Sequence, residues 1–126
     1  MFALLHAAIM DAQIACYEAK YFYWMLRPTQ ADPLVVLVLP EIPLPNHPSY
    51  PSGHSCHAAA AATVLGYFFP DRAAELENVV TQMGLSRLYA GIHYRFDITA
   101  GRDLGNAVGQ WAIAVDESAG LLAAMR

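Results

Sequence analysis

The chain has 126 residues and a mass of 13.8 kDa, which suits one domain or part of one. Apolar residues make up 56% and charged residues only 14%, which excludes a chain kept disordered by polarity and charge. The net charge of −4 and the pI near 5.6 exclude a general electrostatic attraction to nucleic acid or to anionic membranes. The apolar excess also indicates faces that need covering, for example by a partner chain.

An all-α fold is predicted, because alanine is abundant and no stretch alternates clearly between apolar and polar residues. The predicted helices, in chain order, cover residues 2–26, 52–69, 70–83 and 94–119. Arg27-Pro28 ends the first of them, since proline disfavours helix in the residue before it. A proline-rich loop over residues 28–51 follows, with 34–39 as a possible short strand, and a turn is expected over residues 84–91.

The sequence predicts a soluble chain without a membrane span or a signal peptide. The longest apolar run, Ala58 to Phe69, has twelve residues, whereas a spanning helix needs about 20. The first fifteen residues lack a basic start and contain Asp11, which argues against a signal peptide. Cys16 and Cys56 are too few for a disulfide framework; one bridge is possible, but we expect two small buried thiols.

The first cluster with chemical potential is Lys20 and Arg27. Seven residues of helix make nearly two turns, so both side chains are expected on one face, about 10 Å apart. The residues between them are aromatic and apolar, and a charge in such surroundings needs an anion as its partner. The alternative is two solvated charges on a helix surface.

The second cluster is Pro51-Ser52-Gly53-His54 at the start of a predicted helix. Ser52 is a typical N-cap residue, and Gly53 allows a bound group to approach the backbone N–H groups. A helix N-terminus binds oxyanions, and a histidine in its first turn can transfer protons at neutral pH. The alternative is an ordinary capped helix with a surface histidine.

The third cluster consists of Arg87, His93 and Asp97. Asp97 follows His93 at the fourth position, so a helix would place them together. A carboxylate bonded to one imidazole nitrogen fixes the tautomer and leaves the other nitrogen as a nucleophile or ligand. Arg87 can offer a bidentate contact to an oxyanion. The alternative is an ordinary surface pair. Taken together, the three clusters predict one positive pocket for a tetrahedral oxyanion in an otherwise acidic protein.

These residues, Lys20-x6-Arg27-Pro28, Pro51-Ser52-Gly53-His54 and Ser86-Arg87-x5-His93-x3-Asp97, resemble the three-part signature of the type 2 phosphatidic acid phosphatase/vanadium haloperoxidase superfamily. That family folds as an all-α bundle, which agrees with the predicted helices. The resemblance implies that His93 is the nucleophile toward phosphorus or the vanadium ligand, that His54 is the general acid–base, and that Asp97 orients His93. The oxygens of phosphate or vanadate would be held by Lys20, Arg27, Ser52, Gly53 and Arg87.

The branch of the family is indicated by the string from His47 to His54, HPSYPSGH. It resembles bromoperoxidase-type members, which carry a second histidine at the position of His47; a plain loop histidine is the alternative. We therefore expect a haloperoxidase-like enzyme that binds vanadate and oxidises halide with peroxide. The first alternative is a phosphatase that forms a phosphohistidine on the same site, and phosphate or sulfate would mimic the bound anion in either case.

Members of this branch are usually longer, with helices before the first motif. We therefore expect residues 1–126 to form a single helical domain that is the C-terminal part of a larger bundle, incomplete at its N-terminal side. Its partners would be a small-molecule substrate and either a second copy or the missing helices, with no nucleic acid or membrane involved. Two further alternatives are a truncated, non-catalytic module that binds oxyanions and a divalent-metal hydrolase. No divalent metal is expected, because the basic residues would repel a cation.

Overall fold

The computed structural model describes residues 1–38, 40–41 and 43–120, and within them the chain is all-α. The elements are α1 (Phe2–Tyr23), α2 (Pro28–Ala31), α3 (Gly53–Phe68), the 3-10 turn η1 (Pro70–Arg72), α4 (Ala73–Tyr89) and α5 (Arg95–Ala119). The described part of the possible strand, 34–38, is not a strand. Position 39 and the last six residues of the expected domain lie outside the described residues.

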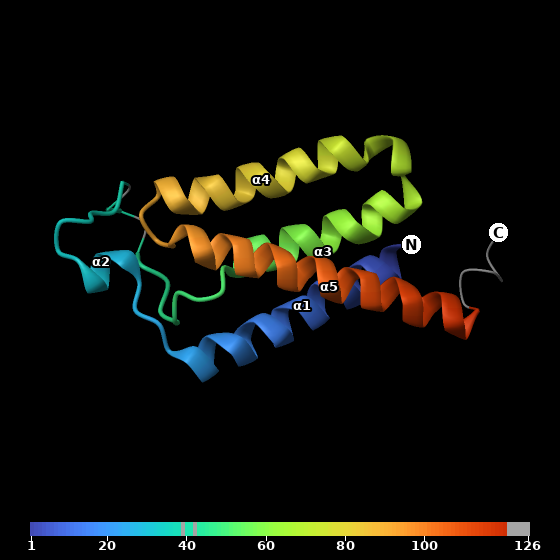
Figure 1. Cartoon of the computed structure of the whole chain (residues 1–126), viewed down its shortest axis with the longest axis horizontal. Coiled ribbons are helices and arrows are strands. Elements are labelled where there is room, and N and C mark those ends of the chain that lie inside the picture. The colour runs from blue at the N-terminus through green and yellow to red at the C-terminus, as the bar shows by residue number, and fades with distance from the viewer. Residues whose placement is uncertain (39, 42, 121–126) are drawn as a thin grey trace.

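Helix α3 occupies the middle of the bundle and packs against α1, α4 and α5 (Figure 1). Helices α1 and α5 also contact each other. The end of α1, the start of α3, the end of α4 and the start of α5 all meet at the end of the bundle where the proline-rich loop and α2 lie. The chemistry-bearing clusters of the sequence therefore meet at one end of the molecule.

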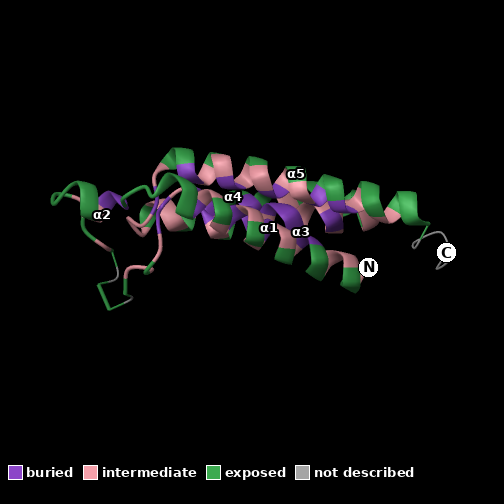
Figure 2. Cartoon of the chain, turned by 90° about the horizontal axis from the view of Figure 1, so that it is seen from below, coloured by how far each residue is buried: buried purple, intermediate pink, exposed green. Residues whose placement is uncertain are grey.

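Small residues form the core, which allows the helices to approach closely. On α1 the buried residues recur at every fourth position, namely Ala8, Ala12, Cys16 and Lys20, so the buried stripe of this helix ends in a lysine. Figure 2 shows the buried residues running along the inside of the bundle, with exposed residues on the outer faces. Cys16 and Cys56 are both buried and free, as expected.

Glycines on α5 face the backbone of α3. A Cβ atom added at Gly101 would lie 2.5 Å from the Ser52 carbonyl oxygen, and one added at Gly105 would overlap the Cys56 carbonyl oxygen. Gly101 and Gly105 lie one turn apart, so they present one face to α3. Their missing side chains let the two helices pack backbone against backbone.

The first helix is shorter than the predicted range 2–26, and Arg27 therefore lies farther from its end than expected. Helix α1 ends at Tyr23, because Trp24 adopts the left-handed conformation with φ 49° and closes the helix with a hydrogen bond to the Lys20 carbonyl. Arg27 instead precedes the short helix α2, which begins at Pro28, a favoured first helical residue. The prediction that Lys20 and Arg27 share one helix face is therefore wrong.

The turn expected over residues 84–91 is also misplaced. Helix α4 continues through Gly84 to Tyr89, so Arg87 lies on a helix, and the turn is confined to the residues around Gly91, where φ is 79°. Gly84 serves packing, because a Cβ there would lie 2.5 Å from Cγ2 of Ile98. A glycine required by a helix contact was thus mistaken for a helix end.

No helix in the described part of the chain is long and apolar enough to cross a membrane. Large apolar side chains are nevertheless exposed on the outer faces of α1 and α5, among them Met10, Ile14 and Trp111, each 60% exposed. The expectation that a second copy or additional helices cover such faces stays a prediction.

We expect Gly105→Ala to destabilise the fold by about 1–3 kcal/mol, because its Cβ must push α5 away from α3. The matched control is Gly66→Ala on α3, where the added Cβ meets only the Ala73 Cβ at 3.9 Å. That variant should be neutral or more stable by roughly 0.5–1 kcal/mol, as for any glycine inside a helix. Urea unfolding measures both; equal effects would contradict the proposed contact.

Candidate active site

A pocket of about 110 Å³ lies at the end of the bundle where the four long helices meet the proline-rich loop. Its lining residues come from α1, from the loop, from the first turns of α3 and from the segment before α5. They are Tyr17, Arg27, Pro45, His47, Gly53, His54, His57, Ile92 and His93.

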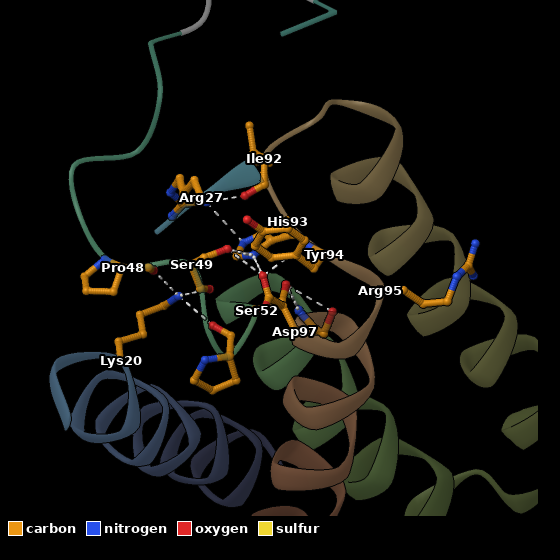
Figure 3. A network of polar contacts seen from close by, with 12 residues as sticks. Lys20, Arg27, Pro48, Ser49, Ser52, Ile92, His93, Tyr94, Arg95 and Asp97 are labelled. Atoms are coloured by element: carbon orange, nitrogen blue, oxygen red, sulfur yellow. Dashed lines mark hydrogen bonds and ion pairs between the residues drawn. The ribbon is translucent and has the colours of Figure 1, made fainter. Parts of the chain in front are cut away.

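His93 and Asp97 form the central pair of the site (Figure 3). His93 Nδ1 lies 2.9 Å from Asp97 Oδ2, and the two residues are 4% and 0% exposed. Because the carboxylate can only accept, Nδ1 carries the proton and the lone pair is on Nε2. Asp97 Oδ2 also accepts hydrogen bonds from Ser49 Oγ at 2.5 Å and from the Tyr94 N–H at 3.1 Å. The orientation and the tautomer of the imidazole are therefore fixed.

The sequence produces this pair through the start of α5. Tyr94 is the N-cap, and Asp97, three residues later, reaches back to its N–H, so the same carboxylate that caps the helix also holds His93. The Asp97 carbonyl in turn accepts the Ser52 N–H at 2.9 Å. This bond joins the first turn of α5 to the residue that begins α3.

Arg27 connects three segments that are distant in sequence. Its Nε donates to the His47 carbonyl at 3.2 Å, and its Nη1 donates to the Ile92 carbonyl at 2.7 Å. Nη1 also lies 3.5 Å from His93 Nε2, and Nη2 lies 3.3 Å from His47 Nδ1. A fully buried guanidinium is thus held directly beside the unprotonated nitrogen of His93.

Lys20 lies behind the pocket rather than in its lining. Its ammonium donates to the carbonyls of Pro48, Ser49 and Pro51 at 2.8, 2.9 and 2.5 Å, which uses all three of its hydrogens. A Cβ added at Gly53 would be 4.0 Å from Lys20 Cε, so the charge lies close behind the α3 N-terminus. Burial, the largest cause, lowers the pKa of Lys20 from 10.5 to about 8.

The first turn of α3 supplies Gly53 and His54 to the lining. Ser52 caps the helix as predicted: its Oγ accepts the Ser55 N–H at 3.4 Å, and Ser52 is fully buried below the pocket. Arg87 reaches across from α4, with Nη1 3.4 Å from His54 Nε2. A basic residue on α4 and a histidine on α3 therefore meet on one side of the pocket.

The histidines of the pocket all favour their neutral forms. Desolvation is the largest cause that lowers the pKa of His93, and Arg27 adds to it against the opposing effect of Asp97. Desolvation also lowers the pKa of His54, followed by the nearby Arg87 charge. The pKa values of His47 and His57 are lowered in the same way. A negatively charged ligand would reverse part of these effects, because it compensates the surrounding positive charge.

The structure brings most of the predicted residues together. Those in the lining are Arg27, His47, Gly53, His54 and His93, while Asp97 and Arg87 contact histidines of the lining, and Lys20 and Ser52 lie behind it. The sequence did not single out Ser49 or Tyr17, and it indicated only a structural or supporting role for His57, which lines the pocket. The contact of Ser49 with Asp97 joins residues 48 positions apart, so local spacing could not predict it. The place of Ser49 within the HPSYPSGH string was the only available indication of a role.

The part of the chain that the structure describes contains no group of three or more His, Cys, Asp or Glu side chains placed to hold a metal ion. The metal-hydrolase alternative therefore has no ligand set among these residues. What the site offers is two guanidinium groups, a helix N-terminus and several neutral imidazoles, a donor set suited to an oxyanion.

Comparisons with known proteins identify the family of this chain. A sequence profile described as the PAP2 superfamily matches residues 2–119. A non-specific acid phosphatase of Salmonella typhimurium is 34% identical over 97 residues, covering 76% of this chain and 39% of the phosphatase. A vanadium-dependent bromoperoxidase of Ascophyllum nodosum is 31% identical over 51% of this chain and 17% of its own length. The structure of a bacterial vanadium-dependent iodoperoxidase matches with a TM-score of 0.77 at 26% identity, covering 88% of this chain and 32% of that one.

The chain belongs to the PAP2 superfamily, to which acid phosphatases and vanadium haloperoxidases are assigned. The expected family and the all-α fold class are confirmed. The chain spans 39% of the length of the acid phosphatase and 32% of the iodoperoxidase.

We expect Ser49→Ala to destabilise the folded chain by about 1–3 kcal/mol, because it removes a hydrogen bond to the buried Asp97 carboxylate. Ser118→Ala is the control: that hydroxyl is exposed and bonds only the Val115 carbonyl of its own helix, so its change should stay within about 0.5 kcal/mol. Urea unfolding of the two variants gives the difference. If Ser49→Ala is as stable as the control, the carboxylate does not depend on this serine.

Proposed function

We propose that this chain hydrolyses phosphomonoesters through a phosphohistidine formed on His93. The observation that carries the proposal is the state of His93: its Nδ1 proton is held by Asp97, and its free Nε2 lies 3.5 Å from the Arg27 guanidinium. A neutral, oriented imidazole beside a fixed positive charge is what an attack on a phosphoryl group requires. The similarity to the Salmonella typhimurium acid phosphatase is the second support.

In the first step, His93 Nε2 attacks phosphorus and the bond to the ester oxygen breaks. Arg27, Arg87 and the backbone N–H groups at the start of α3 stabilise the charge on the three remaining oxygens. His54, on the Arg87 side of the pocket, gives its proton to the departing alcohol oxygen.

In the second step, water attacks the phosphohistidine and phosphate leaves. His54, now neutral, accepts the proton of that water, and Nε2 of His93 is released in its original state. Lys20 contributes from behind the pocket: it fixes the carbonyls of residues 48–51 and places its positive charge close to the α3 N-terminus.

A vanadate-dependent haloperoxidase is the second candidate, and His47 favours it. The sequence placed this function first, but the acid phosphatase relative covers more of the chain than the bromoperoxidase relative and reverses the order. Vanadate has the shape and charge of phosphate, so His93 Nε2 and the Arg27 and Arg87 guanidiniums would hold it. When bound, vanadate supplies the activation of peroxide; His47, in contact with Arg27, would adjust the charge around it.

We further propose that residues 1–126 act as the C-terminal part of a larger helical bundle, incomplete at its N-terminal side. The exposed apolar faces of α1 and α5 and the 39% coverage of the acid phosphatase support this. A non-catalytic module that binds oxyanions is the remaining alternative, and the following experiment distinguishes it.

We expect His93→Ala to lower the hydrolysis of 4-nitrophenyl phosphate by about 10³-fold or more, because no nucleophile remains. Inorganic phosphate should still raise the melting temperature of that variant, since Arg27, His54 and Arg87 stay in place. His6→Ala, which changes an exposed histidine on α1, is the matched control.

Three outcomes separate the candidates. Release of nitrophenol by the wild type but not by His93→Ala supports the phosphatase. Bromide or iodide oxidation that depends on added vanadate and peroxide, without phosphate release, supports the haloperoxidase. A phosphate-dependent rise in melting temperature without either reaction identifies the non-catalytic module.

We expect kcat/KM for a phosphomonoester to fall as the pH rises through the pKa of His54, which lies below 6.5. The reason is that the leaving alcohol needs protonated His54, and desolvation and Arg87 favour the neutral ring. Arg87→Gln removes the charge that lowers the pKa of His54, so the fall of kcat/KM should move to higher pH. The rate itself should drop by about 10²-fold, because Arg87 no longer stabilises the charged oxygens. The pH profile of kcat/KM measures both effects. A limb that stays in place would mean that a group other than His54 supplies the proton.

A further inference from the structure

A second hollow lies directly beside the pocket. It is a groove of about 370 Å³ between the end of α1 and the proline-rich loop, and it shares Pro45 and His47 with the pocket. Tyr21, Trp24 and Met25 form part of its other side. The volume is within the range of small-molecule binding sites, and the shared residues place the groove next to the pocket in which a phosphoryl group would sit.

A series of aromatic rings leads from the pocket to this groove. The Tyr17 ring, in the pocket lining, lies 5.2 Å from the His47 ring and 6.1 Å from the Tyr21 ring. The Tyr21 ring packs edge-on against Trp24 at 5.5 Å. Rings at these separations present flat, apolar surfaces suited to a planar ligand.

Trp24 is held in an unusual conformation. Among the described residues it is the one non-glycine residue with a positive φ, and its side chain remains 69% exposed. A large residue in the left-handed region costs energy, and such residues concentrate at ligand-binding positions. Its N–H bonds the Lys20 carbonyl, so the turn that carries the indole is tied to the lysine behind the pocket.

The chemistry of the groove complements that of the pocket. Its lining contains aromatic and aliphatic side chains, two amides and His47, and neither an acidic side chain nor a lysine or arginine. The positive charge therefore lies where the phosphate binds, and the groove beside it suits an uncharged, planar group.

We propose that the groove binds the aromatic alcohol of an aryl phosphomonoester, with its ring against Trp24 and Tyr21, while the phosphoryl group lies between Arg27 and His54. This assignment rests on the proposed function and narrows it to a substrate class. Trp24 is then a specificity-determining residue: it contacts the aromatic leaving group and takes no part in the reaction at phosphorus.

Two phosphonates test the assignment without turnover. Calorimetry with the full chain should give a lower Kd for 4-nitrophenylphosphonate than for methylphosphonate. Trp24→Ala should raise the aryl Kd about tenfold and leave the methyl Kd unchanged. Trp24→Phe, which keeps a ring, should retain most of the preference. Trp111→Ala, which removes another largely exposed tryptophan, located on α5, should not alter it.

Fluorescence gives a readout that needs no Trp24 variant. In a Trp111→Phe background Trp24 is the remaining tryptophan, and the nitroaryl phosphonate should quench it whereas methylphosphonate should not. In turnover, Trp24→Ala should raise KM for 4-nitrophenyl phosphate and leave KM for glycerol 2-phosphate unchanged.

The assignment is overturned if the two phosphonates bind the wild type equally, or if Trp24→Ala weakens both to the same extent; neither result affects the proposed phosphatase. Failure of inorganic phosphate and of both phosphonates to bind would contradict the proposed function itself and this assignment with it.

Discussion

Three fully buried charges, those of Lys20, Arg27 and Asp97, hold one end of the bundle together. A buried charge is tolerated only when hydrogen bonds replace the water it has lost, so each of them must find partners. Lys20 donates to three carbonyls of the proline-rich loop, and Arg27 donates to carbonyls on either side of the pocket. Asp97 accepts hydrogen bonds from a hydroxyl, an imidazole and a backbone N–H. The loop has this shape because these charges require it.

This arrangement of charges also explains which kind of ligand the site suits. Positive charge, a helix N-terminus and an oriented imidazole are together suited to a tetrahedral anion, and under the proposed function the same set would accept phosphate or vanadate. Which of the two proposed reactions takes place would then depend on whether a phosphomonoester or vanadate is bound. We infer that residues outside the shared set, among them His47 and Trp24, decide between the branches of the superfamily and among their substrates.

Local spacing made part of this structure predictable. The cap at Ser52 forms as expected, because it depends on residues three apart. The contact of His93 with Asp97 also forms, but not on one helix as predicted, because His93 lies in the bend before α5. Contacts over long sequence distances were not predictable. Arg27 lies beyond a helix end that Trp24 sets by adopting a left-handed conformation, and the helix-forming pattern before it gave no sign of this. Likewise the role of Gly84 depends on Ile98 of another helix.

The exposed apolar residues of α1 and α5 have a consequence for how such proteins can vary. Met10, Ile14 and Trp111 lie on outer faces and are absent from the lining of both the pocket and the groove. Helices of different number and length can therefore be attached to those faces while the residues around the pocket keep their contacts. A single reaction centre can in this way be inherited by proteins of very different size, each with its own outer layer.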